Sequence, residues 1–336
     1  MTIKYTKEDC KAHGFVLDDY KMVCDAADAE MAMDAASITT ANMGVPVEFL
    51  TYFDNRAIDV LTEKRAATEI FTEFKAGTRA DLIRKFRMRE GVGYTQPYSD
   101  YSNNGKADVN YNYIPRENYL FETIIEYGEQ EEAETAKAKI NLLADKQMEA
   151  ANVIAIDANR FYMSGVSGME NYGILNAPNL PAAISAATGA GGYTTWATKT
   201  GAEIYADIVA LMANMSTRCG GHVNMTTKYK LVVGPSVYAY LAQQNSLGTE
   251  TVLGMIKRSF INLDVVVAPE YDDSTKKIQL IAMDVQGQKT GELAFSEKLI
   301  AGRIVPDLSS YRQKFTAGTY GAVVYRPIFI STMTGI

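Results

Sequence analysis

The stretch that decides the fold of this chain is EQEEAETAKAKINLLADKQMEAANVIAIDANRFYMS, residues 129–164. It contains no Gly or Pro, and mostly small or apolar side chains recur at spacings of three and four, which is typical of one face of a helix. These side chains are Ala133, Ala136, Ile140, Leu143, Gln147, Ala150, Ile154, Ala158 and Phe161. The pattern predicts a single helix from Glu129 to Ser164, roughly 50 Å long.

The first turns of this predicted helix are strongly acidic. They carry Glu129, Glu131, Glu132 and Glu134. Negative charge near a helix N-terminus is favoured by the helix dipole, so a solvated helix start explains these carboxylates better than a metal-binding cluster. A helix of this length is expected to be the main structural element of its domain, and the segments that flank it determine the architecture.

The segment before the helix, residues 81–127, predicts a long hairpin. Basic and apolar residues mix at a period of about two over 82–89, and aromatic and polar residues alternate over 109–113. The Asn-Gly pair at 104–105 is a strong turn signal, and another strand is expected over 121–127. Because isolated two-stranded hairpins are marginal in water, this one should lie on another surface, and a neighbouring subunit is the natural candidate.

The remaining regions predict an arm, an α/β lobe and returning strands. Residues 1–45 are expected to form an arm with a short helix over 25–36, and an amphipathic helix should follow over 48–62. The lobe covers residues 173–290. Its expected elements are helices over 200–218, 236–244 and 251–258, and strands over 230–235, 261–268 and 278–285.

The C-terminal part contains strand and hairpin signals. Strands are expected around 293–299, 303–314 and 322–330, with a turn at 318–321. In the lobe, Asp272-Asp273 lies between two strand-like runs, and a hairpin turn is favoured there over a metal site.

Composition excludes several classes of function. The chain has 336 residues, 22% charged residues and a formal net charge of -7, which argues against a surface built to neutralise phosphates. No apolar run approaches the length needed to span a bilayer, and the first 14 residues contain no signal-peptide core. Three scattered cysteines fit a reducing compartment, so synthesis in the cytoplasm is expected.

The inventory of catalytic and metal-binding residues is small. His13 and His222 are the two histidines, and neither lies in a recognisable nucleophile or ligand motif. No phosphate-binding, dinucleotide-binding, hydrolase or zinc-protease motif occurs. We therefore expect no enzymatic activity, no cofactor and no required metal.

Four stretches carry a resemblance to a known family. They are ANMGVPVEFLTYFD (41–54), YGILNAPNL (172–180), TTW (194–196) and GTYGAVVYRP (318–327). Together with the order of elements, they resemble the major capsid proteins of tailed bacteriophages, whose fold is shared with encapsulin shells. The resemblance implies an α+β fold with an N-terminal arm, an extended hairpin loop, a peripheral domain with a long spine helix, and an α/β axial domain.

The resemblance also implies a role for each segment. The implied parts are an arm (1–47), a first peripheral segment (48–78), the extended loop over an adjacent subunit (79–118), a second peripheral segment (119–172) with the spine helix (129–163), the axial domain (173–290), peripheral return strands (291–315) and C-terminal axial strands (316–336).

The function implied is self-assembly into an icosahedral or prolate head that encloses double-stranded DNA without sequence-specific binding. Pentamers and hexamers of the chain, a separate scaffolding protein, a portal and a decoration protein are the expected partners. Assembly in the host cytoplasm would place the chain in the virion. An encapsulin-type compartment is the alternative, and a soluble enzyme that uses the 173–290 lobe is a weaker third class.

Contacts between subunits are expected from two groups of residues. Arginine and tyrosine are enriched at interface hot spots, and a neighbour's acidic helix start could pair with the basic side chains. The loop contributes Arg79, Arg84, Lys85, Arg87, Arg89, Tyr94, Tyr98, Tyr101, Tyr111 and Tyr113, and the helix contributes Glu129, Glu131, Glu132 and Glu134.

Overall fold

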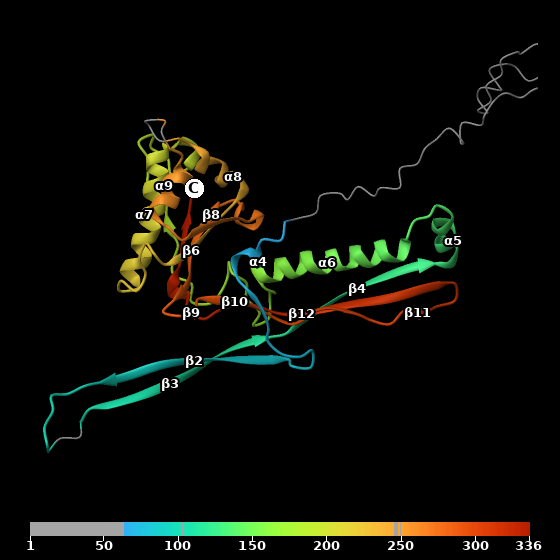
Figure 1. The fold of residues 1–336 in the computed structure, drawn as a ribbon, viewed down its shortest axis with the longest axis horizontal. Helices are drawn as coiled ribbons and strands as arrows, with labels where there is room; N and C mark the ends of the chain where they lie inside the picture. Colours follow the sequence, from blue (N-terminus) through green and yellow to red (C-terminus); the bar gives the residue numbers. More distant parts are fainter. Residues whose placement is uncertain (1–63, 102–103, 245–247, 249) are drawn as a thin grey trace, which may run out of the picture. The chain divides into compact units, whose positions relative to one another are not determined.

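The computed structural model describes residues 64–101, 104–244, 248 and 250–336 (Figure 1). These residues belong to one compact unit, Glu63–Ile336. The helices expected over 25–36 and 48–62 lie outside the described residues. Among the helices that are described, none is long and apolar enough to cross a membrane.

One sheet has five strands in the order β1-β10-β12-β11, with β4 paired to residues 310–319 of β12. Its strands are β1 (Glu73–Lys75), β4 (Tyr119–Gly128), β10 (Gly291–Ala301), β11 (Val305–Pro306) and β12 (Ser310–Val324). β1 runs parallel to β10, and the other pairs are antiparallel. β12 is the long central strand that ties β4 to β10.

Helix α6 (Leu142–Ser164) packs on one face of this sheet (Figure 1). Ala150 and Ile154 of the helix join a buried cluster with strand residues. The phenyl ring of Phe161 lies 5.0 Å, centroid to centroid, from the rings of both Tyr119 and Phe121. The apolar period of three and four read from the sequence is therefore the face that meets the sheet.

The prediction of one continuous helix over 129–164, with a spine helix over 129–163, is wrong. The segment forms α5 (Glu129–Lys137) and α6, separated by four residues. Lys139 has a φ of 60°, a left-handed conformation that cannot continue a right-handed helix. The side-chain oxygen of Asn141 then accepts a hydrogen bond from the Ala144 N–H at 3.4 Å and caps α6. Because α5 ends without Gly or Pro, the hydrophobic periodicity did not indicate this break.

A second sheet has six strands in the order β5-β13-β8-β6-β7, with β9 paired to β8. Its strands are β5 (Ile184–Ser185), β6 (Lys228–Val233), β7 (Leu263–Val267), β8 (Lys277–Val285), β9 (Gln288–Lys289) and β13 (Ile330–Thr334). The helices of this region are α7 (Gly201–Arg218), α8 (Pro235–Tyr238) and α9 (Val252–Ser259), with short 3-10 helices at 196–198, 239–242 and 269–271. The helices and strands expected for the lobe are thus present with boundaries shifted by a few residues, except that the helix expected over 236–244 is the short α8 followed by a 3-10 helix.

The interpretation of Asp272-Asp273 as a hairpin turn is wrong. β6 lies between β7 and β8 in the sheet, so the two strands that flank this pair are not neighbours. The carboxylate of Asp272 instead accepts hydrogen bonds from the Ser236 backbone N–H at 3.0 Å and its hydroxyl at 2.5 Å. Asp272 therefore ties the β7–β8 connection to the start of α8.

The C-terminal expectations need three further corrections. Residues 318–321 are not a turn but lie inside β12, where Gly321 has a φ of 74° and its N–H is bonded to the Thr319 hydroxyl. The boundary expected at residue 316 also falls inside β12, and residues up to Val324 pair in the first sheet. The strand expected over 322–330 is interrupted by a 3-10 helix, Pro327–Phe329, before β13 enters the second sheet.

The two sheets share a buried cluster, which joins them into one unit. It contains residues of the short helix α4 (Ala67–Ile70), of α6 and of strands from both sheets. Examples are Met163, Val232, Ile281 and Leu293. The third sheet, a hairpin of β2 (Ile83–Tyr94) and β3 (Lys106–Glu117), adds few residues to the cores.

Candidate intersubunit surface

The two strands of the hairpin pair without a register shift, from Ile83 opposite Glu117 to Tyr94 opposite Lys106. Because side chains alternate along a strand, the hairpin has two faces of different composition. The Arg/Tyr face carries Lys85, Arg87, Arg89, Tyr111 and Tyr113, and the inner face carries Arg84, Phe86, Met88, Ile114 and Arg116.

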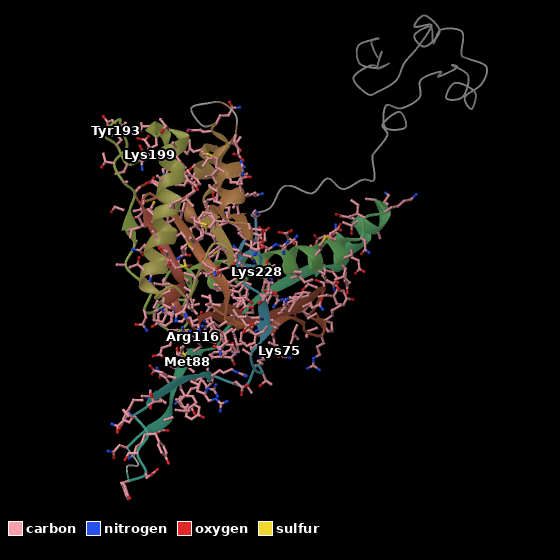
Figure 2. The ribbon with its side chains drawn as sticks, turned by 60° about the vertical axis from the view of Figure 1, so that its left-hand side comes forward. Lys75, Met88, Arg116, Tyr193, Lys199 and Lys228 are labelled. Atoms are coloured by element: carbon pink, nitrogen blue, oxygen red, sulfur yellow. The ribbon has the colours of Figure 1, made fainter. Side chains whose placement is uncertain are left out.

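The inner face anchors the base of the hairpin. The ring of Phe86 lies edge-on to Phe74 at 6.1 Å and to Tyr325 at 6.4 Å between centroids. The Asn118 backbone N–H donates to the Leu82 carbonyl at 2.8 Å. Figure 2 labels Arg116 and Met88 where the hairpin leaves the rest of the unit. Folding of the subunit therefore determines the direction in which the hairpin starts.

Beyond Met88 the hairpin is exposed on both faces. Tyr98 is 92% exposed and Tyr101 is 99% exposed, while Tyr94, Tyr111 and Tyr113 keep more than half of their surface open. Exposed aromatic side chains in this number are unusual for a free surface and are typical of one that is covered by a partner.

The structure brings some of the predicted contact residues together and separates others. The guanidinium carbon of Arg87 lies 5.5 Å from the centre of the Tyr111 ring on the same face. Arg84 points to the opposite face, over Phe86 at 5.8 Å. Arg79 precedes the hairpin, and its Nη1 donates to the Thr316 hydroxyl of β12 at 3.4 Å. The predicted set is therefore not one continuous patch.

The acidic residues predicted as partners lie on α5, none of whose residues is buried. Glu131 is paired with Lys146 at 2.8 Å, and this hydrogen bond holds the pKa of the Glu131 carboxyl below its ordinary value. Glu129, Glu132 and Glu134 form no ion pair with any other residue in the described ranges. Contacts between copies through these residues stay a prediction.

The outer face of the first sheet is a feature that sequence reasoning missed. β4 turns Leu120 and Ile124 away from α6, and Ile124 is 56% exposed. Glu126 on the same face pairs with Arg312 at 3.1 Å. The signal was present, because apolar residues occur at both odd and even positions of this strand, whereas only the odd positions were read as a pattern. Ion pairs and exposed apolar side chains alternate on this uncovered sheet face, which is a second surface suited to a partner.

Arg116 is the most unusual charged residue at the hairpin base. Its side chain is 2% exposed and lies over the ring of Tyr172 at 5.0 Å. Nη1 donates to the Pro115 carbonyl at 2.8 Å, but Nε and Nη2 have no acceptor among the described residues. Burial lowers the pKa of this guanidinium. Nothing in its position in the sequence marked this residue as buried.

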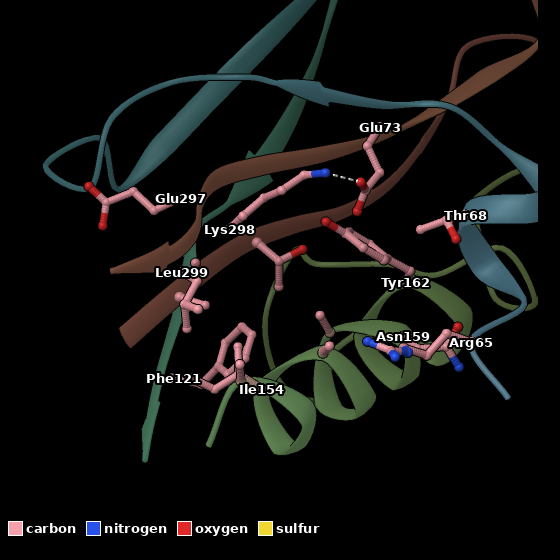
Figure 3. A pocket seen from close by; sticks show the side chains of 16 residues that line it. Arg65, Thr68, Glu73, Phe121, Ile154, Asn159, Tyr162, Glu297, Lys298 and Leu299 are labelled. Atoms are coloured by element: carbon pink, nitrogen blue, oxygen red, sulfur yellow. Dashed lines mark ion pairs between the residues drawn. The ribbon is translucent and has the colours of Figure 1, made fainter. Parts of the chain in front are cut away.

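A cavity of about 480 Å³ lies between α6 and the first sheet (Figure 3). At one end, Lys298 forms an ion pair with Glu73 beside the hydroxyl of Tyr162. Burial and the nearby Glu73 carboxylate raise the pKa of Tyr162. The wall formed by α6 is mostly alanine and apolar side chains, including Ile154, and polar side chains from other segments line the rest. The cavity offers a packing surface rather than a paired nucleophile and base.

The other chemistry-bearing residues are scattered. The described ranges contain no group of three or more His, Cys, Asp or Glu residues placed to hold a metal ion. His222 lies in an exposed loop, with Nδ1 at 3.2 Å from the amide of Gln286. His13 lies outside the described residues.

Comparison with known proteins identifies a family. The model of a family described as Pa193 gp26 major capsid protein matches residues 36–335. No curated protein matches the chain in sequence.

Solved structures share the fold at low sequence identity. The capsid of Myoviridae phage XM1 has a TM-score of 0.70 at 14% identity and covers 87% of this chain and 99% of its own. The capsid of the native GTA particle has a TM-score of 0.60 at 10% identity and covers 90% and 99%. A structure from Mycobacterium phage Bobi has a TM-score of 0.54 at 10% identity and covers 84% and 94%. The expected tailed-phage capsid fold is thereby confirmed.

Proposed function

This chain belongs to the Pa193 gp26 major capsid protein family, and we propose that it closes its shell by laying the β2–β3 hairpin on a neighbouring copy. As a major capsid protein it forms the protein shell of a phage head and is a component of the virion. The encapsulin-type compartment is less well supported, because the matching family is one of major capsid proteins.

The observation that carries the hairpin proposal is the exposure of its outer part. Over residues 89–94 of β2 and 106–111 of β3 the side chains face solvent on both sides of a two-stranded ribbon. Such a ribbon is marginal unless it packs on another element. Its aromatic side chains offer large contact areas, and the uncovered sheet face offers the exposed side chains of Leu120 and Ile124 beside ion pairs. In an assembly of identical copies, each hairpin has one exposed sheet face available to it on another copy.

We further propose that the shell contains pentamers and hexamers. Head-to-tail contacts, in which a hairpin of one copy meets a sheet of the next, are heterologous and close into rings when the rotation allows. The net charge of -7 supports a shell that confines double-stranded DNA without binding it strongly. A separate scaffolding protein, a portal, a decoration protein and assembly in the host cytoplasm complete the proposal.

The chain is further proposed to act without catalytic turnover and without a required metal. The two histidines and three cysteines leave few of the usual ligands, and the family is structural. Elemental analysis of assembled shells tests this point, and a transition metal present at one per subunit would contradict it.

The hairpin proposal is tested by shortening. Replacing residues 89–111 with Asn-Gly keeps the Phe86–Ile114 and Met88–Asn112 pairs at the base and supplies a two-residue turn. We expect a soluble, folded subunit that forms no closed shells in electron micrographs. The control is Glu149→Gln, an exposed substitution on α6 that leaves the hairpin and both of its faces unchanged. Normal shells from the shortened chain would refute the proposal.

A further inference from the structure

A groove of about 720 Å³ lies between the hairpin and the turn that joins β9 to β10. Arg87 and Arg89 line it from the hairpin side. Lys289, Glu292, Tyr325 and Arg326 line it from the other side. The groove is open, and it is formed by the hairpin, by residues 288–292 and by residues 325–326 after β12.

The groove is basic. Four cationic side chains line it against a single carboxylate, Glu292, which is already paired with Lys289 at 2.5 Å. Arg326 donates from Nη1 to the Val285 carbonyl at 3.2 Å, which holds its side chain at the wall. Arg89 has no hydrogen bond or ion pair with a residue in the described ranges. The groove thus presents positive charge that the subunit itself leaves uncompensated.

Helix α5 presents the complementary charge. Glu129, Glu132 and Glu134 project from a nine-residue helix with no buried residue. A helix of this length that is polar all round is marginal by itself and gains stability from a partner surface. The carboxylate of Glu126 on β4, by contrast, is already paired with Arg312. α5 is therefore the acidic surface element best suited to enter a basic groove.

The α5 helix and the groove of one subunit cannot meet. β4 separates them, and a ten-residue strand spans about 33 Å. Figure 1 places α5 and the hairpin at opposite ends of β4. The partner must come from another molecule.

We propose that this groove receives helix α5 of a second copy of the chain, with Arg87 and Arg89 facing Glu129 and Glu132. This inference rests on the proposed self-assembly and assigns one of its contacts. Exposed ion pairs contribute little individually, so the charges select the partner and the register while apolar contacts elsewhere supply most of the affinity.

Charge reversal and its compensation test the proposal. The groove variant is Arg87→Glu/Arg89→Glu, and the helix variant is Glu129→Lys/Glu132→Lys. Each variant is expected to remain folded, because the substituted side chains are exposed. Since like charges then face each other in every contact, shell yield should fall by at least about tenfold. The four substitutions combined in one chain restore opposite charges at every contact. Shell yield should then return to within about twofold of the native chain.

The control variant is Glu149→Lys, which changes an exposed carboxylate on α6 and should leave the yield unchanged. Failure of the combined variant to recover would overturn the pairing of the groove with α5. Normal assembly of both double variants would also overturn this pairing. The proposed function would still be upheld if the shortened hairpin abolished shells. A third outcome would assign the groove to DNA instead. In it, free native subunits bind duplex DNA and the groove variant does not.

Discussion

β6 and β2 are both strands, but they form for opposite reasons. In β6, Tyr229, Leu231, Val232 and Val233 are buried, and the strand lies between β7 and β8. In β2, only Phe86 is buried, and the strand has a single neighbour. β6 is stabilised by burial within its own chain, whereas most of β2 has surface that only a second molecule can bury. Subunit stability and shell stability should therefore respond to different substitutions.

The largest effect is expected in the second sheet's region, at the ion pair between Lys199 and Asp207. Their Nζ and Oδ2 atoms are 2.5 Å apart with both side chains buried, and Trp196 Nε1 donates to the same oxygen at 2.9 Å. Lys199→Met leaves a buried carboxylate without a counter-charge and should cost about 3–5 kcal/mol in the free energy of unfolding. Urea unfolding of free subunits measures this cost.

The compensating variant is Lys199→Met/Asp207→Asn. It removes the charge and keeps an acceptor for Trp196, so most of the lost stability should return. A single Lys199→Met variant as stable as the native subunit would show that the pair is not a structural element of this region.

A slightly smaller effect is expected from truncating the core of β6. Leu231 is fully buried, and Leu231→Ala should destabilise the subunit by about 2–5 kcal/mol through lost burial and a cavity. The matched truncation in β2 is Val92→Ala, for which we expect a change within about 0.5 kcal/mol. Equal losses at both positions in chemical denaturation would remove the distinction between the two strands.

The hairpin should show the reverse behaviour in assembly. Tyr111→Ala/Tyr113→Ala removes two exposed rings from the Arg/Tyr face and should change subunit unfolding by about 0.5 kcal/mol or less at each site. Shell stability should fall by more than about 1 kcal/mol per contact, because buried aromatic anchors dominate interfaces. Dissociation of shells in denaturant, followed by light scattering, compares this variant with Asn110→Ala on the inner face. Equal dissociation of the two variants would contradict the assignment of the Arg/Tyr face.

The smallest effect concerns pH and the start of α7. Glu203 accepts hydrogen bonds from the backbone N–H groups of Ala190 and Thr200 and from the Thr200 hydroxyl, and these bonds lower its pKa below the ordinary 4.5. A lowered carboxyl pKa stabilises the folded state above pH 4.5 and loses this effect as the pH falls through the lowered value. Glu203→Gln should therefore melt below the native subunit near neutral pH, and the gap should shrink on acidification. A gap that is constant with pH would exclude this origin.

The local elements could be read from the sequence because their signals are local. The alternation in 82–89 and 109–113 and the Asn-Gly turn predict the hairpin, and the structure pairs Tyr94 with Lys106 next to that turn. Helix α7 begins at a capping box of Thr200 and Glu203, close to the expected start. The break at Lys139 was missed because its signal is a single Asn cap.

The candidate site was only partly readable. Arg87, Arg89, Tyr111 and Tyr113 share a face because strand periodicity places them there, and that follows from the sequence. The same periodicity places Arg84 on the opposite face, although the predicted contact set grouped it with these residues. The groove depends on β9 and β10 lying beside the hairpin, which local patterns do not determine.

The fold family was expected from a resemblance to known proteins, whereas the sequence by itself determined the hairpin, the acidic start of the helical segment and the small number of candidate catalytic residues. Each depends on residue types or on spacings of two to four positions, which the chain carries without reference to its other parts. The tertiary structure alone decided that β6 lies between β7 and β8, that Arg116 and Lys199 are buried, and that Arg87 and Arg326 line one groove. These outcomes depend on contacts between distant segments, whose free energies are set by packing and by desolvation in the folded chain.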